Sequence, residues 1–97
     1  MQSSTERVRT LLKQYHILRM QVNNGLGGNK LKWEVEFIEN SINALPERDY
    51  KIMVAVYVDK KSIRSAAREA YLSHETVRKR IKKITETMGI VFDGVFS

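Results

Sequence analysis

The chain of 97 residues contains no cysteine, one proline and no long hydrophobic run. The absence of cysteine excludes disulfide bonds, thiolate zinc sites and cysteine nucleophiles. The longest apolar stretch, residues 52–58, is far shorter than the roughly 20 residues that span a bilayer. Met1 is followed by the polar residues QSSTER and not by an apolar signal core. We therefore expect a cytoplasmic chain with no export signal and no membrane partner.

Residues suited to catalysis are also scarce. The only histidines are His16 and His74, and no HExxH pattern occurs. The glycine cluster Gly25–Gly28 follows a predicted helix, whereas a phosphate-binding glycine loop follows a strand. The carboxylates show no paired arrangement suited to acid–base chemistry. We expect no catalytic residues, no metal site and no cofactor, and hence no enzyme.

Two predicted helices occupy residues 1–44. Apolar residues recur every three or four positions from Val8 to Val22 and predict an amphipathic helix over residues 4–23. Glycines within residues 23–30 stop this helix. A second apolar stripe from Leu31 to Leu45 predicts a helix over residues 31–44. The two stripes predict an antiparallel hairpin, and either stripe could instead meet a second subunit or another partner.

Residues 45–58 present a choice between helix and strand. Their β-branched residues, among them Val54 and Val58, would suit a strand. Pro46 suits the first turn of a helix, where its missing N–H costs nothing. Glu47 and Asp49 would interact favourably with the positive end of the helix dipole. We therefore predict a helix.

The segment from Ser62 to Lys83 has the pattern of a helix-turn-helix. Ala66 and Ala67 allow two helices to cross closely, the chain breaks near Tyr71, and Ser73 can cap the following helix. The segment carries seven cations and two acids, whereas residues 31–59 carry three cations and six acids. The positive charge, part of a net +6 for the chain, therefore gathers on one segment. Such a segment typically binds phosphates and places its second helix in the DNA major groove.

Tyr71 departs from the usual helix-turn-helix pattern, because this turn position often holds glycine. A left-handed backbone costs a bulky residue about 1 kcal/mol or more. We therefore expect either a different turn geometry or a tyrosine anchored by packing.

At about 100° per residue, the second helix turns Val77, Ile81, Ile84 and Met88 toward the core and its opposite face toward DNA. The first turns of a recognition helix lie deepest in the groove, and Arg, Lys and Glu side chains can pair with base edges. The predicted base contacts are therefore His74, Glu75, Arg78, Lys79 and Lys82. The predicted DNA-backbone contacts are Lys60, Lys61, Ser62, Arg64, Ser73, Thr76, Arg80 and Lys83.

From Leu45 to about Thr85, the stretch LPERDYKIMVAVYVDKKSIRSAAREAYLSHETVRKRIKK resembles region four of bacterial sigma factors, whose order of elements it follows without insertion. The remainder resembles the small phage late-gene activators of the RinA and ArpU type, in which a helical part with a polar loop precedes a sigma-like helix-turn-helix. The resemblance implies an all-α fold. It would comprise a helical hairpin (1–44), a three-helix DNA-binding domain (45–89) and an apolar C-terminal tail (90–97).

These features predict a sequence-specific regulator of transcription that binds double-stranded DNA. The resemblance implies a phage or prophage activator that works with host RNA polymerase at the nucleoid of a bacterial cell. It places the polymerase contact on the hairpin or the Leu45–Asp59 helix. One alternative is a protein-interaction module that binds polymerase or another regulator without DNA specificity. Another is the DNA-recognition subunit of a phage packaging (small terminase) complex. Because a single helix-turn-helix seldom binds tightly alone, either two half-sites or a tether to polymerase should supply the remaining affinity. Our hypothesis is a homodimer formed through the hairpin or the tail.

Overall fold

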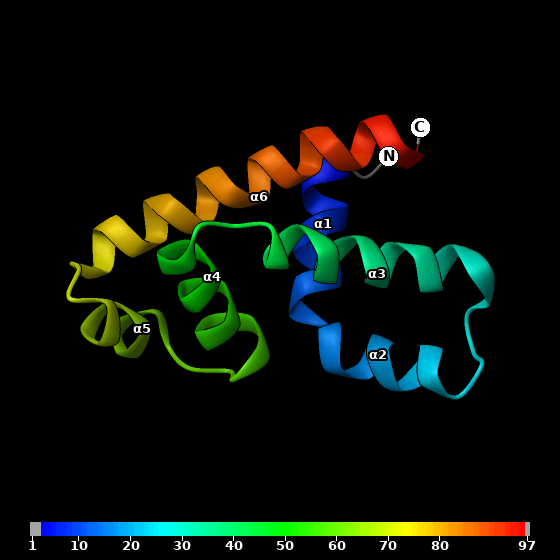
Figure 1. Cartoon of the computed structure of the whole chain (residues 1–97), viewed down its shortest axis with the longest axis horizontal. Helices are drawn as coiled ribbons and strands as arrows, with labels where there is room; N and C mark the ends of the chain where they lie inside the picture. Colours follow the sequence, from blue (N-terminus) through cyan, green and yellow to red (C-terminus); the bar gives the residue numbers. More distant parts are fainter. Residues whose placement is uncertain (1–2, 97) are drawn as a thin grey trace.

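The computed structural model describes residues 3–96, and this part of the chain is built from helices with no β-strand (Figure 1). The elements are α1 (Ser4–Lys13), α2 (Tyr15–Asn23), α3 (Gly28–Asn43), α4 (Glu47–Met53), the π-helix η1 (Val54–Val58), α5 (Ile63–Ala70) and α6 (His74–Phe96). The predicted all-α fold is confirmed. Residues 47–58 form helix and not strand, although the β-branched stretch after Met53 takes the wider π-helical turn.

The core is organised around α1. Val8, Leu11 and Leu12 on this helix are fully buried, and α1 makes its most extensive contact with α6 and a further one with α3. The stripe predicted for α6, Val77, Ile81, Ile84 and Met88, is buried in the same core. Residues 1–44 and 45–89, which we expected as two units, therefore share one core.

The predicted helix over residues 4–23 is wrong in one respect, because it is broken at Gln14 into α1 and α2. The first half packs under α6, whereas the second half turns to lie alongside α3, to which the 24–27 loop connects it (Figure 1). The hydroxyl of Tyr15 donates a hydrogen bond of 2.5 Å to Glu39 of α3. The ammonium of Lys60 donates to the carbonyl oxygen of Lys13 at the break. These contacts fix the bend, so the hairpin consists of α2 and α3 alone.

The predicted boundary at residue 90 is not a break in the structure. α6 continues without interruption to Phe96, so residues 90–96 are its last two turns and not a separate tail. Phe92 is buried, and its ring lies 5.4 Å from that of Phe37 and 4.6 Å from that of Phe96. This aromatic cluster joins the C-terminal end of α6 to α3.

A buried ion pair joins α1 to α3. Glu34 is 2% exposed, and it accepts hydrogen bonds of 3.0 Å from Arg7 Nε and 2.8 Å from Arg7 Nη2. The hydrogen bond to Glu34 raises the pKa of Arg7 above its ordinary value. Both carboxylate oxygens are satisfied, as burial of a charge requires.

α1 and α6 approach each other closely beside Gly89. A Cβ atom built on Gly89 would lie 2.4 Å from Thr5 Oγ1 and 2.9 Å from Thr5 Cα. The second of these atoms is backbone and cannot move aside without moving α1. A residue with a side chain at position 89 would therefore separate the two helices.

We predict that Gly89→Ala destabilises the protein by about 1–3 kcal/mol through overpacking, although alanine improves helix propensity by about 1 kcal/mol. Gly94→Ala is the matched control, because Gly94 lies on the same helix with no atom within 4 Å of its added Cβ. This control should stabilise the helix slightly. Urea unfolding of both variants measures the difference, and equal effects at positions 89 and 94 would contradict the close crossing.

Alkaline pH should weaken the contact between α2 and α3. Burial, together with the hydrogen bond to Glu39, raises the pKa of Tyr15 from 10.0 to about 12. The unfolded chain therefore loses this proton first, so the stabilisation is complete below about pH 10 and is lost as the pH rises toward 12. We predict that the free energy of unfolding falls more steeply over this range in the wild type than in Tyr15→Phe. If the free energy of unfolding falls equally steeply in both proteins, the raised pKa of Tyr15 is contradicted.

Candidate nucleic-acid interface

α5 and α6 are joined by the short turn Tyr71–Ser73 and pack directly on each other. Ala66 and Ala67 of α5 are almost fully buried, and Ala67 belongs to the same core as Val77 and Ile81 of α6. The N–H of Leu72 donates to the carbonyl of Ala67 over 2.9 Å and closes the turn. Ser62 caps α5 by accepting a hydrogen bond from the N–H of Ser65.

Tyr71 adopts the left-handed conformation, with φ 57° and ψ 39°. Its side chain is 94% exposed. Both expectations for this residue are therefore wrong, because the turn has the geometry that favours glycine and no packing anchors the ring. The chain carries a backbone cost of about 1–2 kcal/mol here.

The first turn of α6 is held by its own side chains. Ser73 Oγ accepts a hydrogen bond of 3.1 Å from the N–H of Thr76 and donates one of 2.7 Å to the Thr76 hydroxyl. Ser73 and Thr76 are two of the predicted DNA-backbone contacts. In the free protein their hydroxyls hydrogen-bond to each other at the start of α6. One turn further, Arg78 Nη2 lies 3.3 Å from His74 Nε2, so two predicted base contacts lie side by side.

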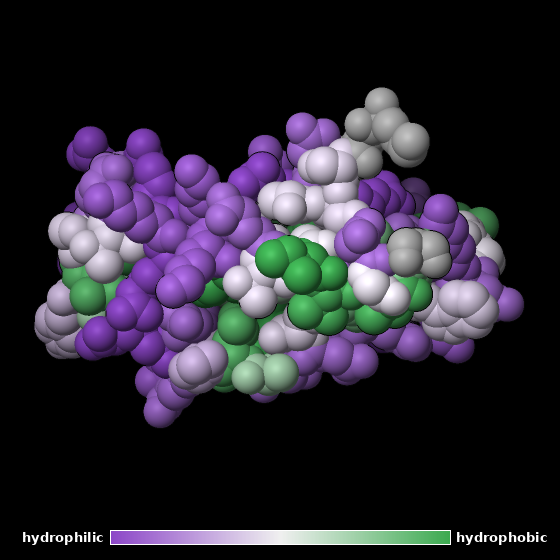
Figure 2. Space-filling view, turned by 90° about the horizontal axis from the view of Figure 1, so that it is seen from above, coloured by the Kyte–Doolittle hydropathy of each residue, from purple (hydrophilic) through white to green (hydrophobic). Residues whose placement is uncertain are grey.

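The predicted base contacts share one helix and lie largely in solvent. Glu75, Arg78, Lys79 and Lys82 are exposed and His74 is half-buried. Within residues 3–96, none of the three cations has an ion-pair partner. Seen from above, the surface over the first half of α6 is accordingly hydrophilic (Figure 2). Several cations this close repel one another, and a bound polyanion would relieve that repulsion.

The structure divides the remaining predicted DNA-backbone contacts into two groups. Arg64 and Lys83 are exposed, with no ion-pair partner among the described residues. Lys61 instead pairs with Glu69 over 2.6 Å, which raises the pKa of its ammonium, and Arg80 pairs with Asp49 over 2.9 Å. Lys60 donates to the Lys13 carbonyl, as described above. These three cations are engaged in the fold.

The predicted DNA contacts omit one exposed cation of the helix-turn-helix segment. Arg68 lies on α5, is exposed and makes no ion pair within residues 3–96. Its position within the positively charged segment was the available signal.

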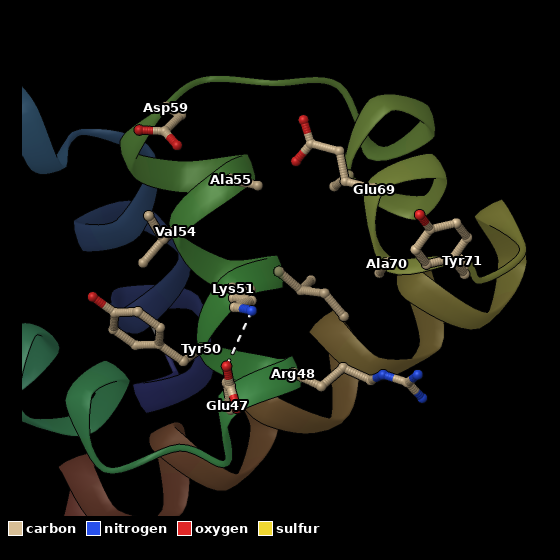
Figure 3. A pocket seen from close by; sticks show the side chains of 12 residues that line it. Glu47, Arg48, Tyr50, Lys51, Val54, Ala55, Asp59, Glu69, Ala70 and Tyr71 are labelled. Carbon is tan, nitrogen blue, oxygen red and sulfur yellow. Dashed lines mark ion pairs between the residues drawn. The ribbon is translucent and has the colours of Figure 1, made fainter.

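A groove of about 530 Å³ separates α4 and η1 from α5 (Figure 3). Ile52, Val54, Ala55 and Ala66 supply its apolar lining, and charges of both signs stand around it. Glu47 and Lys51 form an ion pair of 3.0 Å there. The mixture of an apolar floor and a charged rim suits a protein segment better than it suits a reaction centre.

Comparison with protein-family models, curated proteins and solved structures found no match. Within residues 3–96, no cluster of three or more His, Asp or Glu side chains is arranged to hold a metal ion. No helix in the same part of the chain is both long and apolar enough to cross a membrane.

We predict that Tyr71→Gly stabilises the protein. Relief of the left-handed strain should stabilise the folded protein by about 1–2 kcal/mol. The greater flexibility of glycine in the unfolded chain should offset about 0.5–1 kcal/mol of this gain. Tyr71→Ala is the control, because alanine removes the ring but keeps the strained Cβ. Thermal unfolding should place the glycine variant above both alanine and wild type. A glycine variant no more stable than the alanine variant would contradict the strain.

Proposed function

We propose that this protein is a sequence-specific, double-stranded DNA-binding regulator of transcription that reads DNA with the first three turns of α6. The observation that carries the proposal is the set of exposed cations Arg78, Lys79, Lys82 and Lys83 on a helix capped by Ser73. Arg80 on the same helix pairs with Asp49. The other four cations have no carboxylate partner within residues 3–96, so phosphates and base edges are the groups that they could bind.

Within this proposal, the base contacts are Arg78, Lys79 and Lys82, flanked by His74 and Glu75. Arginine or lysine can donate to guanine, and a glutamate can accept from cytosine. Arg64, Arg68 and Lys83 would bind phosphates and set the register of the protein on the duplex. Lys61 and Arg80 would first have to leave Glu69 and Asp49, so we assign them a smaller share of the phosphate binding.

We further propose that the protein is a phage or prophage activator that acts with host RNA polymerase at the bacterial nucleoid. This part of the proposal rests on the resemblance of Leu45–Thr85 to sigma region four. The groove between α4 and α5, with its charged rim (Figure 3), is the surface we assign to the polymerase.

A second candidate function is a protein-interaction module without DNA specificity. It is favoured by the exposed apolar side chains of Ile17, Met20 and Leu26 on α2 and the following loop, which are 62%, 65% and 59% exposed. Side chains of this kind gathered on one arm of a hairpin mark a surface for another protein.

Selection of bound genomic fragments by the purified protein tests the first candidate. We predict one recovered motif, and a loss of roughly 10- to 100-fold in affinity for it in Arg78→Ala, as expected for removal of one good base contact. Affinity for random DNA should fall much less, because phosphate binding persists.

Lys32→Ala is the matched control, because Lys32 is an exposed cation on α3 with no ion-pair partner in residues 3–96. It removes the same charge and should leave the recovered motif unchanged. Equal losses in Arg78→Ala and Lys32→Ala would show that only net charge matters. No binding of any DNA at low salt would favour the interaction module.

A further inference from the structure

The character of α6 changes along its length. The exposed side chains of its first turns are charged, whereas the last two turns expose Ile90, Val91 and Val95, at 75%, 50% and 60%. Seen from above, apolar surface gathers near the middle of the molecule, beyond the hydrophilic end (Figure 2). Ile90 projects only about 20° from Lys79 around the helix, whereas Val91 and Val95 project about 120° and about 160° from it. Val91 and Val95 therefore form an apolar ridge that can be covered while the charged face is occupied.

An apolar groove runs beside this ridge, between α6 and α3. At one end, a hollow of about 680 Å³ is lined by Ala44, Leu45, Ile84, Met88 and Val91. At the other end, a hollow of about 410 Å³ is lined by Trp33, Phe37, Val95 and Phe96. The two helices run in opposite directions (Figure 1). Neighbouring positions of both helices line the two hollows, Ser41 and Asn40 on α3 and Val91 and Val95 on α6, so we treat the two hollows as one groove. Trp33 is 56% exposed there, which leaves a large aromatic surface uncovered.

The two ends of the groove carry opposite charges. Lys83 lines the first hollow and Glu36 lines the second. Neither side chain has an ion-pair partner within residues 3–96. An occupant of this groove is therefore favoured if it presents an acidic group at the first hollow and a basic group at the second.

We propose that the occupant is a second copy of this chain, packed antiparallel so that the ridge of each protomer enters the groove of the other. A two-fold interface requires one patch that is complementary to itself, and here ridge and groove adjoin on the same face. The two-fold rotation also reverses the groove, so that Lys83 of each protomer meets Glu36 of the other. In the dimer this pairing replaces the phosphate contact assigned to Lys83 above, and Arg64 and Arg68 keep theirs. The same contact would cover Trp33 and Val95 in both copies.

The spacing that this dimer would give to its two DNA-reading segments agrees with the proposed DNA binding, and this comparison rests on that proposed function. The centre of the ridge and groove lies near residue 89 of α6, and the base-reading turns are centred near Arg78. At 1.5 Å per residue, an antiparallel pair of α6 helices would place the two reading segments about 30–40 Å apart. Half-sites one helical turn apart on DNA are separated by about 34–36 Å.

Light scattering of the free protein at tens of micromolar tests the proposal. We expect twice the chain mass of 11.3 kDa, and a single chain mass for Val91→Lys and for Val95→Lys. Ile17→Lys, which places the same charge on an exposed apolar residue of α2, should remain dimeric. A monomeric wild type, or a dimer lost only in Ile17→Lys, would overturn the proposal.

Charge reversal tests the antiparallel arrangement. Glu36→Lys and Lys83→Glu should each weaken the dimer roughly tenfold, because each change places like charges together at two symmetric points. The double variant should recover most of this loss, and no recovery would refute the pairing. Since these masses are measured without DNA, a dimer that binds no DNA refutes the proposed function alone, and a DNA-binding monomer refutes only the dimer.

Discussion

The close crossing of α1 and α6 at Gly89 is the constraint on which the rest of the structure depends. Thr5 approaches Gly89 so closely that no side chain fits between the helices. This approach brings Val8, Leu11 and Leu12 of α1 into the core beside Val77, Ile81 and Ile84 of α6. The Arg7–Glu34 ion pair then fixes α3 against α1. Because both α3 and α6 pack on α1, this small chain, which contains no cysteine, holds a long helix in place without a disulfide bond.

α6 connects the two surfaces that we assign to function. It is a single helix of 23 residues, about 35 Å long. Its C-terminal half is anchored at Gly89 by the approach of α1 and near its end by the rings of Phe92 and Phe96. Its first turns pack on α5, and their cations Arg78, Lys79, Lys82 and Lys83 have no ion-pair partner within residues 3–96. Because the helix is continuous, the separation between the charged face and the apolar ridge is fixed. A dimer formed through the ridge would therefore set the spacing of the DNA sites.

The sequence predicts the parts of this structure that depend on periodicity. The buried stripe of α6, the helix beginning after Pro46 and the alanine contact of α5 all follow from local spacing. The break at Gln14 could not be predicted, because the apolar stripe runs through it and tertiary contacts on α3 and α6 decide the bend. The partners of Lys61 and Arg80 were missed for a similar reason. Asp49 lies 31 positions from Arg80, and only the fold brings the two together.

The most direct test of DNA reading by α6 is a map of backbone amide resonances for the free protein and for its complex with a duplex. We predict that the largest changes in amide resonance position fall on residues 73–83 and at the start of α5. The resonances of α2 and the 24–27 loop should stay unchanged. The changes should fade as salt is raised, because phosphate contacts release counterions. Changes centred on α2 and α3 with an undisturbed α6, or no changes at low salt, would contradict DNA reading by α6.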